Sequence, residues 1–319
     1  MTGSHLVDEL LAQTDWAVVG VTRPGAGHTN LADALASAEA ARLSLREVEL
    51  EDPAAVSELV KDVEPDLVYH LAAQSSPGLS FSEPQDTVRA NLVATTNVLE
   101  AMRNNPSSKT FVLASSSEVY SDATAKGAFV DEEADIAPAS PYAATKIAAE
   151  LMARVYSDAY RIKTHVLRTS THTGPRRASV FAESAFARQI AMIEADAQAP
   201  VVKVGDLSAL RTYTDVRDIA RAYRLAGDLN AEGWALFNVG APTQISIADV
   251  LKTLVSLSTM ADEIVVESGT QPKRPLEVRQ IRPDSSKFMS ATGWQPTFEI
   301  RQTLLDLLNY WRRQVSRTR

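Results

Sequence analysis

Short apolar runs alternate with amphipathic segments along most of the chain. Residues 16–21, 110–114 and 163–169 are rich in apolar and β-branched side chains and have the length of buried strands. Segments such as residues 53–63 and 87–104 repeat apolar side chains every three or four positions, as amphipathic helices do. This alternation predicts an α/β fold in which helices cover both faces of a parallel sheet.

The same pattern assigns the other elements. Strands are expected at residues 16–21, 45–50, 66–73, 110–114, 163–169, 201–204, 236–239 and 263–267. Helices are expected at residues 1–13, 53–63, 87–104, 142–160, 183–195, 219–229, 246–257 and 300–313, and a loop at residues 205–218.

The strict alternation loosens after residue 170. We therefore expect a Rossmann-like, doubly wound first domain over residues 1–170, to which part of residues 205–240 returns. Residues 171–319 are expected mainly to form a smaller, mixed α/β domain for the substrate.

The first residues have the pattern of a helix, for which Ser4 is a candidate cap. Its apolar face is expected to consist of Leu6, Val7, Leu10 and Leu11. A dinucleotide-binding sheet begins with a strand, a glycine-rich turn and then the first helix. Gly3 is interpreted as the last glycine of such a turn, so the first strand and the earlier glycines are expected upstream of Met1. Those elements would seat a pyrophosphate at the helix N-terminus.

Composition narrows the possible chemistry. The chain lacks cysteine, which excludes disulfides, thiolate nucleophiles and cysteine-based metal sites. Its five histidines (His5, His28, His70, His165 and His172) have no ligand-like spacing, so no metal site is expected. The formal net charge of −8 argues against non-specific nucleic-acid binding but leaves room for a local anion site.

Two features concern location. No apolar run approaches the roughly 20 residues that a membrane-spanning helix needs. The first residues show no signal-peptide pattern, so a cytoplasmic location is expected.

The most informative stretch lies between residues 114 and 146. Tyr142 and Lys146 are four positions apart and share one face of a predicted helix. A neighbouring ammonium lowers the pKa of a phenol, which can then exchange a proton near neutral pH. A hydroxyl from residues 115–117, at the end of the preceding strand, can hold a substrate oxygen against that phenol. The motif predicts a proton-transfer site for a carbonyl/alcohol pair; the alternative is an ordinary helix start with a packed tyrosine and a solvated lysine.

Ordered landmarks along the chain support the catalytic interpretation. They are Gly3, residues 70–73, Asn91, Ser116, Tyr142, Lys146, residues 174–175, Arg211, residues 215–218, 238–240, 274–278 and 293–294. In this order, the chain resembles the extended short-chain dehydrogenase/reductase family that acts on nucleotide sugars. The resemblance covers nearly the whole chain apart from the first strand.

Residues 204–218 and the Arg-Pro-x-Glu-Val segment at residues 274–278 are most similar to enzymes that act on GDP-mannose derivatives. The resemblance favours a reductase of GDP-4-keto-6-deoxy-D-mannose, which yields GDP-rhamnose. The alternatives are GDP-mannose 4,6-dehydratase and related epimerases. Glu118 stands where a dehydratase carries its third catalytic group, but a reductase can carry a glutamate there as well.

The resemblance implies a role for each residue of the reactive motif. Tyr142 would donate a proton to the C4 oxygen, Ser116 would bind the same oxygen, and Lys146 would lower the pKa of Tyr142 and bind the nicotinamide ribose. Glu118 completes the candidate catalytic set. The cofactor would supply the hydride.

The cofactor is expected to be NADP(H) rather than NAD(H). Arg23 follows the strand whose end faces the adenosine ribose, where an arginine accommodates a 2′-phosphate; a solvated loop arginine is the alternative. Glu49 and Leu50, at the end of the next predicted strand, are candidates for contacting adenine. The other implied cofactor positions are Gly3, Leu71, Ala72, Ala73, Asn91, Tyr142, Lys146 and His172. His70 is expected to be a core histidine.

The partner is expected to be a nucleotide-diphosphate sugar. Arg211 and Arg274 are the main candidates for its phosphates, since guanidinium groups suit phosphate oxygens, and Glu277 is a candidate for its ribose. The weaker candidates are Ser75, Ser116, Thr171, Arg176, Arg177 and Arg188, together with Lys203, which is also interpreted as a surface residue.

The resemblance also implies a homodimer formed through the helices at residues 92–102 and 142–160. Two further functional classes stay open at this point. One is a non-catalytic NADP-binding scaffold, and the other is an interaction module without a ligand.

Overall fold

The computed structural model describes residues 1–105, 107, 109–120, 128–269, 275–276 and 280–317. Its central sheet has four parallel strands in the order β11 (Trp234–Val239), β6 (Lys163–Thr169), β4 (Thr110–Ser116) and β3 (Leu67–His70). In this register Ser116 lies opposite Thr169, which lies opposite Val239. The carboxyl ends of the strands therefore meet at one edge of the sheet, where polar loop residues can converge.

A second, smaller sheet precedes the central one in the chain. It consists of the parallel pair β1 (Val18–Thr22) and β2 (Leu43–Glu47). Among the described strands, none pairs with both β1 and β3, although Val18 and Tyr69 contact the same apolar cluster. The strand expected upstream of Met1 stays a prediction.

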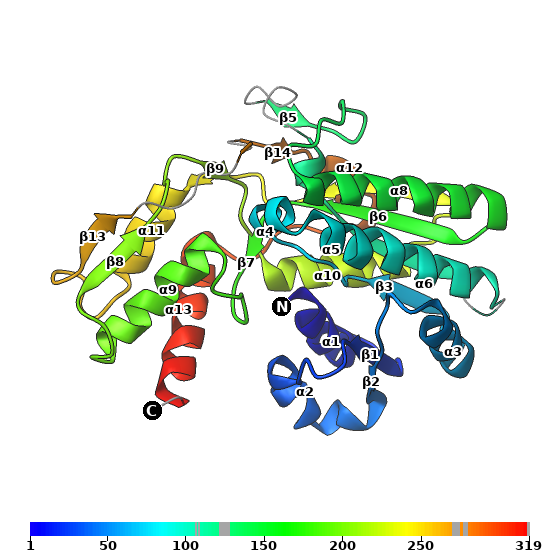
Figure 1. Ribbon diagram of the computed structural model, residues 1–319, viewed down its shortest axis with the longest axis horizontal. Helices are drawn as coiled ribbons and strands as arrows, with labels where there is room; N and C mark the ends of the chain where they lie inside the picture. Colours follow the sequence, from blue (N-terminus) through cyan, green and yellow to red (C-terminus); the bar gives the residue numbers. More distant parts are fainter. Residues whose placement is uncertain (106, 108, 121–127, 270–274, 277–279, 318–319) are drawn as a thin grey trace.

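Helices cover both faces of the central sheet (Figure 1). One face packs against α1 (Thr2–Gln13), α10 (Val216–Asp228) and α12 (Ser286–Thr292), with Tyr223 and Trp294 fully buried between them. The other face packs against α3 (Pro53–Val63), α6 (Ala94–Arg103) and α8 (Pro141–Tyr160). The predicted α/β fold with a doubly covered parallel sheet is confirmed.

The second half of the chain builds a separate apolar core (Figure 1). Its main elements are α9 (Ala182–Glu194), β8 (Val201–Val204), α11 (Ile247–Ser256), β13 (Val265–Ser268) and α13 (Ile300–Arg317). β8 and β13 form a parallel pair, in which Val202 and Val204 of β8 pack into the core with α9 and α11, whereas the side chains of β13 are exposed. Short connecting pieces are β5 (Phe129–Val130), β7 (His172–Thr173), β9 (Leu210–Arg211), β10 (Thr214–Asp215), β12 (Ile245–Ser246), β14 (Arg282–Pro283), α2 (Ala32–Leu35), α4 (Pro77–Ser82) and α5 (Pro84–Val88).

Several boundaries differ from those expected. β2 ends at Glu47, so the Glu49–Leu50 pair lies in the turn before α3 rather than in a strand. The segment 205–218 contains β9, β10 and the start of α10 instead of being only a loop. Asp215 caps α10 by accepting from the Arg217 N–H at 2.8 Å, which moves the start of that helix ahead of the predicted residue 219.

The first helix is capped differently from the prediction. Its N-cap is Met1, without a side-chain cap bond, and the Ser4 hydroxyl donates to the Met1 carbonyl at 2.8 Å. The apolar face is as expected, since Leu6, Val7, Leu10 and Leu11 are all buried. In the described part of the chain, no helix combines the length and apolarity needed to cross a membrane.

A buried carboxylate ties α10 to the segment before α13. Asp218 is fully buried and accepts from the Thr297 N–H at 2.9 Å, the Thr297 hydroxyl at 2.8 Å and the Phe298 N–H at 3.1 Å. It also pairs with Arg221 at 2.9 Å. The Asp218 carboxylate thus accepts hydrogen bonds from two backbone N–H groups of the segment that leads into α13.

We expect Asp218→Asn to lower the free energy of unfolding by about 2 kcal/mol, because hydrogen bonds to a charged, buried acceptor are among the strongest. Urea unfolding monitored by circular dichroism measures the loss. Asp228→Asn is the control, since Asp228 pairs with Arg224 at the surface and should change stability little. Equal stabilities of Asp218→Asn and the control would contradict this account.

Candidate active site

The N-terminal turn of α8 presents the two residues of the reactive motif. Ser140 caps this helix by accepting from the Ala143 N–H at 3.1 Å, and Pro141 occupies its first turn. Tyr142 and Lys146 follow one turn apart, on the face that packs toward β4. Both side chains are buried, at 8% and 6% exposure. The alternative of a solvated lysine is therefore excluded.

The end of β4 supplies the hydroxyl. Ser116 is the last residue of the strand, and its hydroxyl oxygen accepts from the Glu118 N–H at 3.1 Å where a short turn begins. The Ser116 side chain also lies near the Tyr142 phenol and lowers its pKa. The structure thus brings a hydroxyl at the end of β4 and Tyr142 together.

Burial dominates the acidity of Tyr142. It raises the pKa of the phenol well above its usual value, and the nearby Glu118 carboxylate raises it further. The nearby Ser116 side chain and the positive charge of Arg177 act in the opposite direction. In this state the phenol holds its proton at neutral pH, as a proton donor must.

Lys146 also differs from the expectation. Burial lowers the pKa of its ammonium to about 8, while the negative charge of Glu150 raises it. Its Nζ donates to the Ala114 carbonyl at 2.8 Å and lies 5.9 Å from the centre of the Tyr142 ring. The groups that lower the pKa of Tyr142 are Ser116 and Arg177, so the expected effect of Lys146 on Tyr142 is not found here.

The N-terminus of α1 meets the loop after β6 beside this motif. The Thr2 hydroxyl and His172 Nε2 are 2.9 Å apart, and His172 Nδ1 bonds to the Ser170 carbonyl at 3.0 Å. Burial, followed by the charge of Arg177, lowers the pKa of His172 to about 4, so the imidazole is neutral. Gly3 lies in the first turn of α1, and a Cβ there would meet nothing within 4 Å.

Arg177 was ranked below Arg211 and Arg274 from the sequence but lies at this junction. Its Nε donates to Glu183 at 3.2 Å, and its guanidinium carbon is 3.3 Å from the centre of the Phe181 ring. Its charge acts on both Tyr142 and His172. The sequence has no local signal that distinguishes Arg177 from Arg176, because the two arginines are adjacent in one loop and differ only in their tertiary partners.

The adjacent Arg176 contacts α1 and α2 instead. Its guanidinium pairs with Asp8 at 2.6 Å and with Asp33 at 3.7 Å, which ties the loop to α1 and α2. Arg188 is exposed on α9 and lies 6.0 Å from the centre of the Trp311 ring, and Lys203 is exposed on β8. None of these three lines either pocket described below, so the structure does not support them as substrate ligands.

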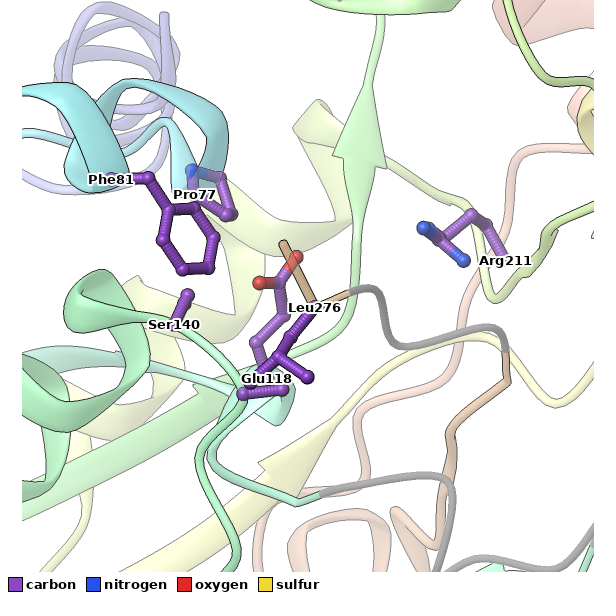
Figure 2. A pocket seen from close by; sticks show the side chains of 7 residues that line it. Pro77, Phe81, Glu118, Ser140, Arg211 and Leu276 are labelled. Carbon is purple, nitrogen blue, oxygen red and sulfur yellow. The ribbon is translucent and has the colours of Figure 1, made fainter. Parts of the chain in front are cut away.

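A pocket opens beside Ser140, the N-cap of α8, and is shown in Figure 2. Its lining comes from Pro77, Phe81, Glu118, Ala139, Ser140, Arg211 and Leu276. The Glu118 carboxylate points into the space between Phe81 on α4 and Arg211 on β9 (Figure 2). An adjoining pocket shares Glu118 and Arg211 and adds Ser117, Thr171, Leu210, Thr212 and Ile281. The two pockets thereby bring Glu118, Arg211 and Thr171 together.

The expected cofactor residues lie around the same edge of the sheets. Arg23 is exposed directly after β1, and Leu71–Ala73 directly follow β3, with Ala72 exposed. Ser75 is exposed in the next turn. Glu49 is exposed, whereas Leu50 is half-buried and its carbonyl accepts from Asn97 at 2.9 Å.

Asn91 supports the site instead of facing it. Its amide bonds to the Gln74 N–H at 2.7 Å, the Gln74 carbonyl at 3.1 Å and the Thr145 hydroxyl at 2.9 Å. These bonds hold the turn after β3 against α8, so direct cofactor binding by Asn91 is not supported. His70 is buried and hydrogen-bonded to Thr95 at 3.0 Å, as expected of a core histidine. Arg274 and Glu277 lie outside the described residues.

Comparison with known proteins decides the family. Residues 1–307 match the family model described as GDP-mannose 4,6 dehydratase. The chain belongs to this family. A relative from Pseudomonas aeruginosa, GDP-6-deoxy-D-mannose reductase, is 32% identical over 252 residues, covering 79% of this chain and 82% of the relative.

Solved structures of members and relatives of the family have the same fold. RMD from Pseudomonas aeruginosa, complexed with NADPH, has a TM-score of 0.78 at 29% identity and covers 93% of this chain and 99% of that one. UDP-glucose 4-epimerase from Thermus thermophilus, complexed with NAD, has a TM-score of 0.83 at 26% identity and covers 98% of this chain and 96% of that one. The expected resemblance to nucleotide-sugar dehydratases, reductases and epimerases is confirmed, and the protein is an enzyme of this group.

The burial of Lys146 predicts a pH-dependent stability. Its folded-state pKa of about 8 lies below the usual 10.5, so the unfolded chain binds more protons between these values. Stability should therefore rise with pH across this window, relative to a variant without the lysine, by about 2 to 3 kcal/mol. Urea unfolding of the wild type and Lys146→Met at about pH 7 and about pH 10 measures the difference. A difference that does not change with pH would contradict the charged, buried lysine.

Proposed function

We propose that the protein is an NADP(H)-dependent reductase of GDP-4-keto-6-deoxy-D-mannose that forms GDP-rhamnose. The observation that carries the proposal is the buried trio of Tyr142, Ser116 and Lys146 beside a pocket that contains Arg211 and Glu118. The similarity to a GDP-6-deoxy-D-mannose reductase supports the choice of substrate. The fold supports the reaction class, since several structural relatives act on nucleotide sugars.

Each residue of the trio has a role in reducing the C4 carbonyl. Ser116 and Tyr142 bind the carbonyl oxygen together, and Tyr142 donates the proton as the alcohol forms. A raised pKa suits this direction, because the phenol is protonated at the start of the reaction. Lys146 carries its charge one turn away and binds the nicotinamide ribose. Bound NADPH supplies the hydride.

We assign the cofactor as NADP(H) on four observations. Arg23 is exposed after β1, where it can meet a 2′-phosphate. The N-terminal turn of α1, with Gly3 and His172 beside it, suits a pyrophosphate. Arg177 adds positive charge next to Tyr142. The structural relative RMD is complexed with NADPH, whereas the epimerase is complexed with NAD.

The substrate would enter the pocket around Glu118. Arg211 contributes to both halves of this pocket and suits the diphosphate. Phe81 and Pro77 offer an apolar wall for the deoxysugar ring (Figure 2). Thr171 and Ser75 stay peripheral candidates for polar contacts. Arg274 and Glu277 stay predictions for the nucleotide.

A dehydratase is the second candidate, and Glu118 is the observation that favours it. Its carboxylate points into the pocket, where a base is needed to take the C5 proton of GDP-mannose (Figure 2). The family model that matches the chain is described as a GDP-mannose 4,6 dehydratase. The two candidate functions thus differ in the substrate and in the role of Glu118, whereas Tyr142, Ser116 and Lys146 are used in both.

The decisive experiment mixes the protein with NADPH and GDP-4-keto-6-deoxy-D-mannose and follows the absorbance of the reduced nicotinamide. We expect stoichiometric loss of NADPH with formation of GDP-rhamnose, and slower turnover with NADH. Formation of the ketosugar from GDP-mannose and NADP⁺, without net NADPH consumption, would identify a dehydratase instead.

A Tyr142→Phe variant tests the chemistry in the same assay. Loss of the donor should lower kcat by about 100-fold or more while NADPH still binds. Tyr310→Phe, on α13, is the matched control and should retain activity. If neither the wild type nor the variant turns over any nucleotide sugar while both bind NADPH, the protein is a non-catalytic scaffold.

We also propose that the protein is a homodimer. α8 exposes a stripe of apolar side chains, with Leu151 at 62% and Val155 at 58%, and Val93 is exposed beside α6. Isolated exposed apolar residues are common, but a stripe on adjacent helices is typical of an interface. Such a contact would form a four-helix arrangement around a two-fold axis.

Light scattering after size-exclusion chromatography tests this interface. The wild type should have the mass of two chains, and the double variant Leu151→Glu/Val155→Glu should have the mass of one, because charges would be buried in the contact. Val180→Glu is the control, since this residue is 69% exposed and lies away from α8. A monomeric wild type would refute the dimer.

A further inference from the structure

A buried ion pair lies behind the reactive trio and has no part in the proposed reaction. Glu150 and Arg168 are 4% and 3% exposed. The Arg168 Nε and Nη2 atoms donate to the two carboxylate oxygens of Glu150 at 3.0 and 2.8 Å. A two-pronged pair of this kind fixes the direction of both side chains as well as their separation.

The pair is part of a network that spans four elements. The Ser115 hydroxyl donates to Glu150, which joins α8 to the end of β4. Arg168 Nη1 donates to the Tyr120 hydroxyl at 2.7 Å, and that hydroxyl donates to Asn238 on β11 at 3.0 Å. All of these side chains are buried. Burying two charges in this way is costly, and their replacement by apolar residues is often neutral for stability.

Two members of the network, Ser115 and Glu150, are close in sequence to the residues of the reactive trio. Ser115 directly precedes Ser116, and Glu150 lies one helical turn beyond Lys146. Ser116 and Lys146 must both be held to a fraction of an ångström for proton transfer and ribose binding. Glu150 accepts from Ser115 at the end of β4 and lies on the same helix as Tyr142 and Lys146.

We propose that Glu150, held by Arg168, is a positioning residue for the reactive trio: it anchors the end of β4 to α8 and provides a negative charge that acts on the Lys146 ammonium. The inference rests on the proposed reductase function for its kinetic part only. Its structural part concerns Lys146 and the end of β4 whatever the substrate is.

The effect of Glu150 on the pKa of Lys146 depends on the other charged and titratable groups around the ammonium. Tyr142 on α8 is protonated, and the buried His70 on β3 has its pKa lowered to about 3, so both are neutral at physiological pH. Arg168 on β6 is positive but neutralised by Glu150. Glu150 therefore counteracts the burial that lowers the pKa of Lys146. Without its charge, the unpaired Arg168 would further disfavour the ammonium.

Glu150→Gln isolates this charge, because glutamine keeps the size of the side chain and can still accept from Ser115. Glu194→Gln is the matched control. Glu194 forms a similar two-pronged pair with Arg312, at 2.7 Å for both contacts, in the other domain. Glu150→Gln should lose more stability than Glu194→Gln, because Arg168 is 3% and Arg312 is 28% exposed. A merely structural role for Glu150 would leave the titration of Lys146 unchanged in both variants.

The first readout is the titration of Lys146, followed by nuclear magnetic resonance of protein labelled at the lysine ε-carbons and assigned with Lys146→Arg. In Glu150→Gln we expect the titration to move down by about one pH unit, with no shift in Glu194→Gln. The second readout is the pH profile of kcat for the wild type and both variants with NADPH and the ketosugar. Its alkaline limb should move down by the same amount in Glu150→Gln, with NADPH affinity retained.

An unchanged Lys146 titration in folded Glu150→Gln, or an equal shift in Glu194→Gln, would overturn the proposal. If the wild type turns over no ketosugar while the titration still moves as expected, the proposed reductase function fails and the positioning role stands. If Glu150→Gln does not fold, Ser115→Ala replaces it as the test. That variant should lower kcat several-fold with an unchanged KM, and wild-type kcat would overturn the anchoring role.

Discussion

The contact between α8 and the end of β4 is the constraint on which the site depends. α8 carries Tyr142, Lys146 and Glu150 on successive turns, and β4 ends in Ser115 and Ser116. Two hydrogen bonds join the two elements, from Lys146 to the Ala114 carbonyl and from Ser115 to Glu150, and Ser116 lies near the Tyr142 phenol. Because the three side chains of α8 lie along one helix face, a shift of α8 by a single turn would break all three contacts together.

Burial gives these polar groups their chemical character. Burial raises the pKa of Tyr142, which favours the neutral phenol. It lowers the pKa of Lys146, which makes the ammonium easier to deprotonate. Glu118 raises the pKa of Tyr142 further, and Arg177 opposes it. A proton donor for a carbonyl needs a phenol that is protonated and close to a cation, and the fold brings both conditions together in one buried site.

The residues of the candidate site come from two parts of the fold. The central sheet and its helices hold Tyr142, Ser116 and Lys146, whereas Arg211 comes from β9, in a segment that the sequence predicted to be only a loop. β9 pairs with β12, just before α11, which packs in the second apolar core. The pocket that contains Glu118 and Arg211 is therefore lined from both parts of the fold. Reductase and dehydratase chemistry share this geometry and differ in what Glu118 does within it.

Local patterns in the sequence determined the fold class, the helix that carries Tyr142 and Lys146, and the core role of His70, since periodicity and spacing act over a few residues. Tertiary structure decided which of two adjacent arginines faces the site. Arg176 pairs with Asp8 and Asp33, whereas Arg177 pairs with Glu183 and its charge acts on Tyr142. Tertiary structure also decided that Asn91 hydrogen-bonds Gln74 in the turn after β3, and that Glu150 pairs with Arg168. Those outcomes depend on partners that are distant in the sequence and meet only when helices pack on the sheet, so no local pattern encodes them.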